Sequence, residues 1–265
     1  MRNWVKRRRL NGFVQTSRRR WVIENAFVFA AGRGERLRPL TDSCPKPLLP
    51  LAGRPILAWI FDQLERLSLK RVVVNVFYLK EPLKDYLQEE AKKRSFEICI
   101  SEEFELLGTA GGLKFAQGWL KEQALLTING DVYCEFDWKS FLERAQSLEA
   151  DGHWALTELK TLQTPVFVGD DHRVLKIGEL WEAKGVKPAD LSQAFCFSGV
   201  QYIPRLDWQA LPERGCLVRD YWLSQLQKGS RLLGHQGLFK AWADLGSPES
   251  YQYWDRQLQK EAGLR

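Results

Sequence analysis

The chain has 265 residues, a length that suits one large domain or two small ones. Its 45% hydrophobic and 27% charged residues are typical of a soluble globular protein, and no apolar run approaches the roughly 20 residues of a membrane-spanning helix. The five cysteines are widely spaced and contain no C-x-x-C pair, which argues against a zinc site or a disulfide framework. This usage predicts a cytoplasmic protein.

The net charge of +6 is concentrated at the N-terminus. Residues 1–20 carry eight basic and no acidic side chains, so the net charge of the remainder falls from +6 to −2. Such a segment can bind nucleic acid or an anionic surface, or act in targeting, but it lacks the apolar core of a secretory signal. We expect residues 1–24 to be a disordered basic extension, with no nucleic-acid or membrane partner.

From residue 25 onward, apolar strand-like runs alternate with helical patterns. The predicted strands are 26–31, 71–77, 96–100 and 124–128, and the predicted helices between them are 55–67, 81–94 and 110–120. This order favours a parallel, doubly wound sheet with helices on both faces. After residue 150, short strands predict mixed or antiparallel additions, and two helices close a single domain over residues 25–265. These later strands are 154–159, 165–169, 173–177 and 195–203, and the closing helices are 216–228 and 248–261.

A glycine-rich loop follows the first predicted strand. It reads Ala30-Ala31-Gly32-Arg33-Gly34-Glu35-Arg36-Leu37-Arg38-Pro39-Leu40-Thr41 and is followed by Pro45-Lys46-Pro47-Leu48. Ligands bind at the loops that leave the carboxyl ends of parallel strands, and glycines there let backbone N–H groups approach phosphates. Arg36 offers a fixed fork of donors to a triphosphate, and Lys46 offers a point charge between two prolines. Neither a Walker A lysine nor the third glycine of a dinucleotide fingerprint is present.

This segment resembles the signature of the sugar-1-phosphate nucleotidyltransferases, G-x-G-x-R-L/M-x-P-L-T…P-K-P-L, of which every position is filled. The resemblance implies a Rossmann-like, glycosyltransferase-A type three-layer α/β/α sandwich with a mostly parallel mixed sheet. It also implies that Arg36 neutralises the triphosphate and the departing pyrophosphate, and that Lys46 contacts the phosphates at the reacting centre. The residues implied to bind the nucleotide are Ala30, Ala31, Gly32, Arg33 and Gly34.

Two aspartates are candidate ligands of a magnesium ion. Asp131 follows the predicted strand 124–128 in the run Asn129-Gly130-Asp131, and a carboxylate at a strand end is well placed to hold a hard cation. Asp244 precedes Ser247 and Pro248, which also read as the N-cap and first residue of a helix. Asn-Gly-Asp alone is equally a turn signal. The resemblance extends to both elements and implies that Asp131 and Asp244 bind Mg²⁺ together, with Asp131 acting in catalysis.

Two further segments resemble family elements on the base and sugar sides. Leu107-Gly108-Thr109-Ala110-Gly111-Gly112-Leu113 is similar to the element that packs against the nucleotide base, which implies that Gly108, Gly111 and Gly112 approach the nucleotide. Phe195-Cys196-Phe197-Ser198-Gly199-Val200 is similar to the segment near the sugar. Asn129, Ser198 and Gly199 are therefore candidate sugar contacts, although Ser-Gly in a strand is often only a bulge.

The resemblance implies that a sugar 1-phosphate attacks the α-phosphorus of a nucleoside triphosphate and releases pyrophosphate, with no protein nucleophile. The three histidines are scattered in the sequence, and we expect them to be structural or exposed. We expect a single-domain member of the family, because no segment resembling the left-handed β-helix or acyltransferase domain of many relatives follows Asp244. We also expect a monomer or small homo-oligomer.

Among the short members, the pattern is most similar to the N-acetylmuramate-1-phosphate uridylyltransferases. Mannose-1-phosphate guanylyltransferases come next, and glucose-1-phosphate thymidylyltransferases are less favoured. An alternative of another class is a catalytically silent subunit that binds nucleotide sugars. A silent subunit would be expected to lose its metal or phosphate ligands, whereas Arg36, Lys46, Asp131 and Asp244 are all present.

Overall fold

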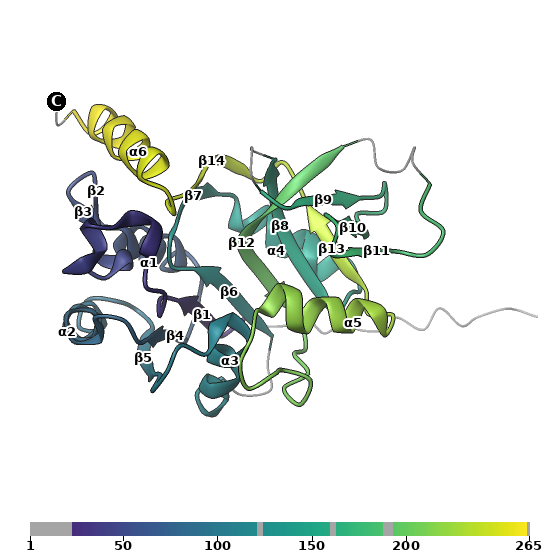
Figure 1. Ribbon diagram of the computed structural model, residues 1–265, viewed down its shortest axis with the longest axis horizontal. Helices are drawn as coiled ribbons and strands as arrows, with labels where there is room; N and C mark the ends of the chain where they lie inside the picture. The colour runs from purple at the N-terminus through teal and green to yellow at the C-terminus, as the bar shows by residue number, and fades with distance from the viewer. Residues whose placement is uncertain (1–22, 121–123, 160–162, 188–192, 264–265) are drawn as a thin grey trace, which may run out of the picture.

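The computed structural model describes residues 23–120, 124–159, 163–187 and 193–263 (Figure 1). The predicted basic extension lies outside the described residues, apart from Ile23 and Glu24. Within the described ranges, no helix combines the length and the apolar character needed to cross a bilayer.

The N-terminal half of the chain forms four parallel strands in the order β5-β4-β1-β6. The central strand β1 (Asn25–Phe29) pairs with β4 (Arg71–Val76) and with β6 (Leu125–Asn129), and β5 (Glu97–Glu102) extends the sheet beyond β4. The connecting helices are α1 (Ile56–Leu64), α2 (Lys80–Ala91) and α3 (Gly108–Phe115). Because the strand order moves away from β1 and then returns across it to β6, the loops after β1 and β6 open a crevice between them.

Alternating side chains of β1 explain why helices cover both faces of this sheet. Ala26 and Val28 are buried in one apolar cluster with the inner faces of α1 and α2, whereas Phe27 is buried in another with α3. Successive strand residues point to opposite faces, so both faces of a central parallel strand must be apolar. The result is a three-layer arrangement, with the site at the carboxyl ends of the strands.

The C-terminal half extends the sheet with mostly antiparallel strands. β12 (Ala194–Ile203) is antiparallel to β6 and joins the halves, as the centre of Figure 1 shows. Along its length β12 also pairs with β8 (Gly152–Glu158) and β9 (Pro165–Val168). The remaining strands are β10 (Val174–Ile177), β11 (Trp181–Glu182) and β13 (Leu232–His235), of which β13 is parallel to β8. The predicted mixed α/β fold is therefore confirmed.

A two-stranded sheet connects the middle of the chain to its end. β7 (Val132–Phe136) pairs antiparallel with β14 (Phe239–Asp244), and α4 (Trp138–Ser147) follows β7. The predicted closing helix 216–228 is a π-helix over Leu217–Trp222 that continues as α5 (Leu223–Gln227). The last helix, α6 (Pro248–Glu261), begins as predicted, because the Ser247 side chain accepts a hydrogen bond from Ser250 N.

The remaining elements are short, and most of them follow the glycine-rich loop in the chain. A small hairpin consists of β2 (Pro50–Leu51) and β3 (Arg54–Pro55). The 3₁₀-helices are Glu35–Leu37, Leu40–Asp42, Lys46–Leu48 and Ala116–Gly118. The hairpin, α6 and the loop share a third apolar cluster, which includes Leu37, Leu51 and Leu258. The C-terminal helix therefore supports the glycine-rich loop, which carries Arg36, and the segment after it, which carries Lys46.

Candidate functional site

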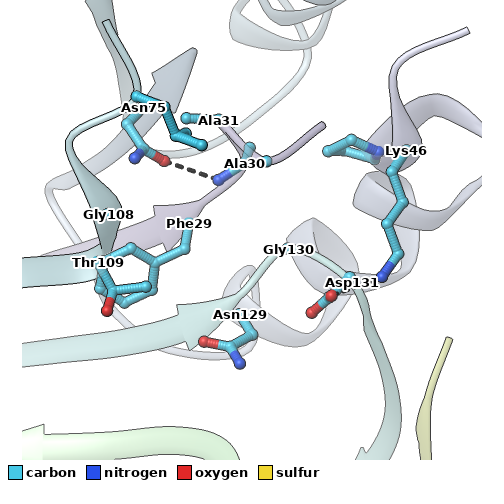
Figure 2. A pocket seen from close by; sticks show the side chains of 13 residues that line it. Phe29, Ala30, Ala31, Lys46, Asn75, Gly108, Thr109, Asn129, Gly130 and Asp131 are labelled. Atoms are coloured by element: carbon cyan, nitrogen blue, oxygen red, sulfur yellow. Dashed lines mark hydrogen bonds and ion pairs between the residues drawn. The ribbon is translucent and has the colours of Figure 1, made fainter. Parts of the chain in front are cut away.

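Three neighbouring strands end at the same level and form the floor of a cavity of about 310 Å³. Phe29 of β1 pairs in register with Asn75 of β4 on one side and with Asn129 of β6 on the other. Figure 2 shows these side chains around the cavity, with Ala30 and Ala31 continuing from β1. The residues that line this smaller cavity are Phe29, Ala30, Ala31, Gly32, Lys46, Pro47, Asn75, Leu106, Gly108, Thr109, Asn129, Gly130 and Asp131.

The glycine-rich loop contributes its first residues to the cavity and uses the next ones to hold its shape. Ala30, Ala31 and Gly32 line the smaller cavity, whereas Arg33 and Gly34 do not. The backbone φ of Gly34 is 63°, and a Cβ there would lie 2.8 Å from Thr41 Cγ2. Thr41 Oγ1 donates a hydrogen bond of 2.9 Å to the Gly34 carbonyl. Gly34 therefore closes the loop against Thr41, while Arg33 is exposed.

Lys46 reaches from the glycine-rich loop to the end of β6. Its Nζ lies 2.6 Å from Asp131 Oδ2, and only 9% of the lysine side chain is exposed (Figure 2). A cation buried to this degree needs a charged partner. Asp131 remains one-third exposed, at 33%, so this ion pair faces the cavity rather than the core. The pair places a positive and a negative group where two distant segments of the chain meet.

Asp131 and Asp244 are brought together by the pairing of β7 with β14. Asp244 pairs with Val132, and Leu245 N donates a 3.0 Å hydrogen bond to the Asp131 carbonyl. Asp244 Oδ1 accepts from Gly246 N at 2.7 Å. In the described part of the chain, Asp131 Oδ1 and Asp244 Oδ2 have no hydrogen-bonding partner.

Two carboxylates with one uncommitted oxygen each fit a magnesium ion. Mg²⁺ is commonly held by one or two carboxylates while substrate phosphates and water complete its octahedron. Among the described residues, no three His, Cys, Asp or Glu side chains form a metal cage. The protein oxygens therefore suit a metal ion that arrives with phosphate ligands, rather than one bound by protein alone.

A larger cavity of about 930 Å³ adjoins the smaller one and shares Asn129 and Asp131 with it. Arg36 and Asp244 line it, and a Cβ on Gly246 would collide with the Arg36 guanidinium group. Its remaining walls are Val132, Trp154, Gln163, Thr164, Pro165, Val166, Ile177, Gly178, Glu179, Leu180, Cys196, Phe197, Ser198, Gly199, Cys216, Val218, Arg219 and Trp242. Of the predicted phosphate-side residues, Lys46 lines the smaller cavity and Arg36 lines the larger one, and Asp131 lines both.

Ser198 and Gly199 both line the larger cavity, but their roles in the fold differ. Ser198 Oγ is buried and donates a 2.8 Å hydrogen bond to the Ala155 carbonyl, so the hydroxyl supports the bulge in β12. Gly199 has a φ of 87°, and a Cβ there would lie 2.8 Å from both Cγ and Nδ2 of Asn129. Gly199 therefore leaves the space in which the Asn129 amide lies, between the two cavities.

The three glycines predicted to approach the base are in different surroundings. Gly108 lines the smaller cavity, together with Thr109. Gly111 and Gly112 are buried behind the cavity wall and are not among the residues that line it. A Cβ on Gly111 would collide with the Glu213 carbonyl, so this glycine accommodates the protein's own backbone.

Asn75 and Thr109 line the smaller cavity but were not predicted from the sequence. Asn75 is the polar residue in the apolar run 71–77, and its place near a strand end was the available signal. Asn75 Oδ1 accepts a 2.7 Å hydrogen bond from Ala30 N, the dashed line in Figure 2. Thr109 Oγ1 accepts from Leu217 N at 2.8 Å, which joins α3 to the π-helix.

The histidines are scattered in the sequence but gathered in the fold, away from both cavities. His153 Nδ1 and His235 Nε2 lie 3.1 Å apart in the core, and the His172 ring centroid lies 5.6 Å from that of His235. Burial lowers the pKa of His153 to about 3, helped by repulsion from His235 and Arg231. The two buried histidines are therefore neutral structural groups.

All five cysteines are free, and burial raises the pKa of Cys196 to about 11.

The fold and the site together define an α/β protein with a ligand crevice at a topological switch point and charged groups where two cavities adjoin. The sequence profile of the family described as "Nucleotidyl transferase" matches residues 25–167, more than half of the chain. This chain belongs to the nucleotidyl transferase family.

Similar proteins agree with this membership. The chain is 37% identical over 126 residues to N-acetylmuramate alpha-1-phosphate uridylyltransferase of Neisseria meningitidis serogroup B, which covers 46% of this chain and 53% of that protein. It is 38% identical over 120 residues to mannose-1-phosphate guanylyltransferase catalytic subunit beta of Drosophila melanogaster, covering 44% and 32%. The chain thus matches about half or less of the length of these relatives.

A solved structure shows the same fold. HddC from Yersinia pseudotuberculosis complexed with GMP-PN matches with a TM-score of 0.65 and 22% identity, over 89% of this chain and 100% of that chain. The likeness covers both the parallel and the antiparallel halves, because it extends over nine-tenths of the residues.

Proposed function

We propose that this chain joins a nucleoside triphosphate to a sugar 1-phosphate and releases pyrophosphate. The observation that carries the proposal is the Lys46–Asp131 ion pair at the junction of two cavities, with Arg36 and Asp244 beside it. A reaction between two phosphate-bearing substrates needs two neighbouring binding sites and positive charge where they meet. We assign residues 25–265 to this catalytic domain.

In this assignment the nucleotide occupies the smaller cavity and the sugar occupies the larger one. Ala30, Ala31 and Gly32 present backbone against the nucleotide, and Gly108 and Thr109 form the opposite wall. The sugar lies near Gly199 and Asn129. The phosphate oxygen of the sugar then faces the α-phosphorus in line with the leaving pyrophosphate, which Arg36 neutralises, while Lys46 contacts the phosphate at the reacting centre.

Members of this family generally use a divalent metal ion, and we propose Mg²⁺ here. Asp131 and Asp244 would hold it through their uncommitted oxygens, and the ion would supply Lewis-acid stabilisation of charge on the phosphates. Asp131 also forms the ion pair that holds Lys46 in place. Its carboxylate would therefore position both the lysine ammonium group and the metal ion. The proposed reaction needs no protein nucleophile and no general base, because the attacking sugar phosphate is already an anion.

Pyrophosphate release in the presence of Mg²⁺ tests this proposal. UTP, GTP, dTTP, CTP and ATP are each paired with a panel of sugar 1-phosphates, and one productive pair is expected. A full panel without product, from a folded protein that still binds nucleotide, would instead support a silent nucleotide-sugar-binding subunit.

For the sugar, we favour N-acetylmuramate 1-phosphate with UTP over mannose 1-phosphate with GTP. The specific observation is Arg219, an exposed side chain of the π-helix that lines the larger cavity. Within the described residues Arg219 has no ion-pair partner. Arg36 and Arg219 are the two arginines among the described residues that line this cavity. N-acetylmuramate carries a carboxylate that mannose lacks, and a guanidinium fork matches a carboxylate. Glu179 also lines this cavity, and its negative charge would disfavour a second anion unless Arg219 offsets it.

Two sugars that differ only in the lactyl ether test the role of Arg219. Arg219→Gln is expected to raise KM for N-acetylmuramate 1-phosphate about tenfold, the discrimination of a charged hydrogen bond, and to leave KM for N-acetylglucosamine 1-phosphate unchanged. An equal effect on both sugars would contradict a carboxylate contact. Preference of the wild-type enzyme for mannose 1-phosphate and GTP would replace the substrate assignment and leave the reaction class intact.

A further inference from the structure

A chain of three hydrogen bonds, which runs through two buried side chains, links the two walls of the smaller cavity. One wall is the backbone that leaves β1 at Ala30, and the other is the segment from Leu106 to Thr109. Between them lie the side chains of Asn75, at the end of β4, and Glu103, which follows β5. Glu103 is only 1% exposed and Asn75 only 3%.

Each bond in this bridge has a defined donor and acceptor. Ala30 N donates to Asn75 Oδ1 at 2.7 Å, and Asn75 Nδ2 donates to Glu103 Oε1 at 2.7 Å. Glu103 Oε2 accepts from Leu107 N at 3.1 Å. The backbone N–H groups at both ends can only donate, so the amide of Asn75 cannot turn over without losing the bond to Ala30. The path therefore spans from one wall to the other through two side chains.

Gly112 makes room for this bridge. A Cβ at residue 112 would lie 2.5 Å from Glu103 Oε1 and 2.8 Å from Asn75 Nδ2. Gly112 lies inside α3, where a glycine costs about 1 kcal/mol relative to alanine. The missing side chain thus serves the Asn75–Glu103 contact rather than a base in the cavity.

The role of the Glu103 carboxyl group in this bridge is to accept hydrogen bonds through both of its oxygens. Burial raises its pKa, while the hydrogen bonds from Leu107 and Asn75 act in the opposite direction. An unpaired buried carboxylate is costly, and two donated hydrogen bonds offset that cost only while both walls stay in place. Loss of either bond would release the Leu106–Thr109 wall relative to Ala30.

We propose that Asn75 and Glu103 are positioning residues that set the distance between the two walls of the nucleotide cavity and thereby govern affinity for the nucleoside triphosphate. The inference rests on the proposed function only in naming the occupant of the smaller cavity. Neither residue acts on the sugar phosphate, because Asn75 and Glu103 do not line the larger cavity.

A reciprocal exchange of amide and carboxylate tests this inference. In Glu103→Gln, the new NH₂ group must face either Asn75 Nδ2 or Leu107 N, so one acceptor is lost. In Asn75→Asp, two carboxylates face each other at the 2.7 Å contact. In the double variant, the carboxylate at position 75 can accept from Ala30 N and from the amide NH₂ at position 103, while the amide oxygen at position 103 accepts from Leu107 N. The double variant therefore retains every bond of the bridge.

We expect each single variant to raise KM and Kd for the productive nucleoside triphosphate at least tenfold, with KM for the sugar 1-phosphate and kcat changed less than threefold. The double variant should return both nucleotide constants to within threefold of wild type. Glu102→Gln is the matched control, because Glu102 pairs with Lys80 and Lys84 on the surface. A purely structural role would lower the folded fraction, and hence kcat, without changing either KM.

A second pair of variants covers the case in which the single exchanges fail to fold. Gly112→Ala should weaken nucleotide binding at least tenfold, whereas Gly118→Ala should not, because nothing lies within 4 Å of a Cβ at residue 118. Unchanged nucleotide Kd in folded Glu103→Gln or Gly112→Ala, or a folded double variant that stays as weak as the singles, would overturn the inference. Failure of the proposed function would look different, because wild type itself would then bind no nucleoside triphosphate or form no product.

Discussion

The two cavities of this molecule are built in different ways. The smaller one rests on strands that end in register, with Asn75, Phe29 and Asn129 side by side, so that backbone pairing defines its floor. The larger one is assembled mainly from segments after residue 150, whose strands are mostly antiparallel. Substitutions should therefore affect the nucleotide in one cavity, the sugar in the other, and both substrates at Asp131, which with Asn129 lines both cavities.

The largest effect is expected at Asp131. Asp131→Asn removes a proposed metal ligand and leaves the 9%-exposed Lys46 without its carboxylate, so kcat/KM should fall roughly 10³-fold for both substrates. Initial rates of pyrophosphate release measure the loss. Asp85→Asn, on the exposed face of α2, is the control and should behave as wild type. Near-normal turnover in folded Asp131→Asn would remove this residue from the mechanism.

A substitution of Arg36 distinguishes stabilisation of the departing pyrophosphate from binding of the sugar. Arg36→Gln should lower kcat about 100-fold, as removal of a charge-stabilising group does, while KM for the sugar changes little. Steady-state kinetics with each substrate varied in turn distinguish the two constants. A two- or threefold loss would mean that the guanidinium group does not contact the departing pyrophosphate.

Gly199 tests whether the larger cavity is specific to the sugar. Gly199→Ala places a methyl group 2.8 Å from the Asn129 amide and strains a φ of 87°, which costs about 1–3 kcal/mol of stability. KM for the sugar 1-phosphate should rise about tenfold, because displaced Asn129 no longer presents the same hydrogen bonds. Gly53→Ala is the matched control, since its φ is 78° and nothing lies within 4 Å of the added Cβ. If the two variants lose stability equally and keep the same KM, then the Asn129 contact is irrelevant to the sugar.

The smallest effect concerns a region outside both cavities. The pKa is lowered from 6.5 to about 3 for His153 and to about 4 for His235, mainly by burial. Well above pH 6.5 both histidines are neutral in the folded and in the unfolded chain, so neither makes stability depend on pH. Below pH 6.5 the unfolded chain binds protons first, and stability falls by up to about 1.4 kcal/mol per pH unit for each histidine until its folded pKa is reached.

Urea unfolding between pH 6.5 and 4.5 measures this slope. His235→Gln should reduce the slope by up to about 1.4 kcal/mol per pH unit, because one buried histidine no longer titrates. An unchanged slope in the variant would show that protonation of His235 is not coupled to unfolding. Nucleotide KM should stay at the wild-type value at pH 7.5, since His235 lines neither cavity.

Local patterns in the sequence predicted the parallel half well. Predicted strands 26–31, 71–77 and 124–128 correspond to β1, β4 and β6 within two residues at each end. The Ser247 cap and Pro248 start of α6 were also readable, because capping depends on neighbouring residues alone. Strand β7 was not predicted, since Val132–Phe136 follows β6 across a two-residue turn and its place depends on the distant partner β14.

The candidate site shows the same division. Motif spacing singled out Arg36, Lys46, Asp131 and Asp244. The fold places Asp131 just before β7, next to Asp244 at the end of β14, and brings Lys46 to Asp131. Spacing could not show that Gly112 serves the Asn75–Glu103 bridge, because that contact joins three elements. Nor could it show that His153 and His235 touch, 82 residues apart.

The sequence by itself determined which residues carry charge and backbone freedom, and in what order they occur along strands and loops. Hydrophobic periodicity and helix capping depend only on residues that are close together in the chain, so the sequence alone reveals them. Only the tertiary structure decided how those residues are shared between two cavities, which glycines face ligand space and which face protein, and which polar groups are buried together. Those outcomes depend on strand register and on contacts between segments far apart in the chain, whose free energies appear only once the sheet is assembled.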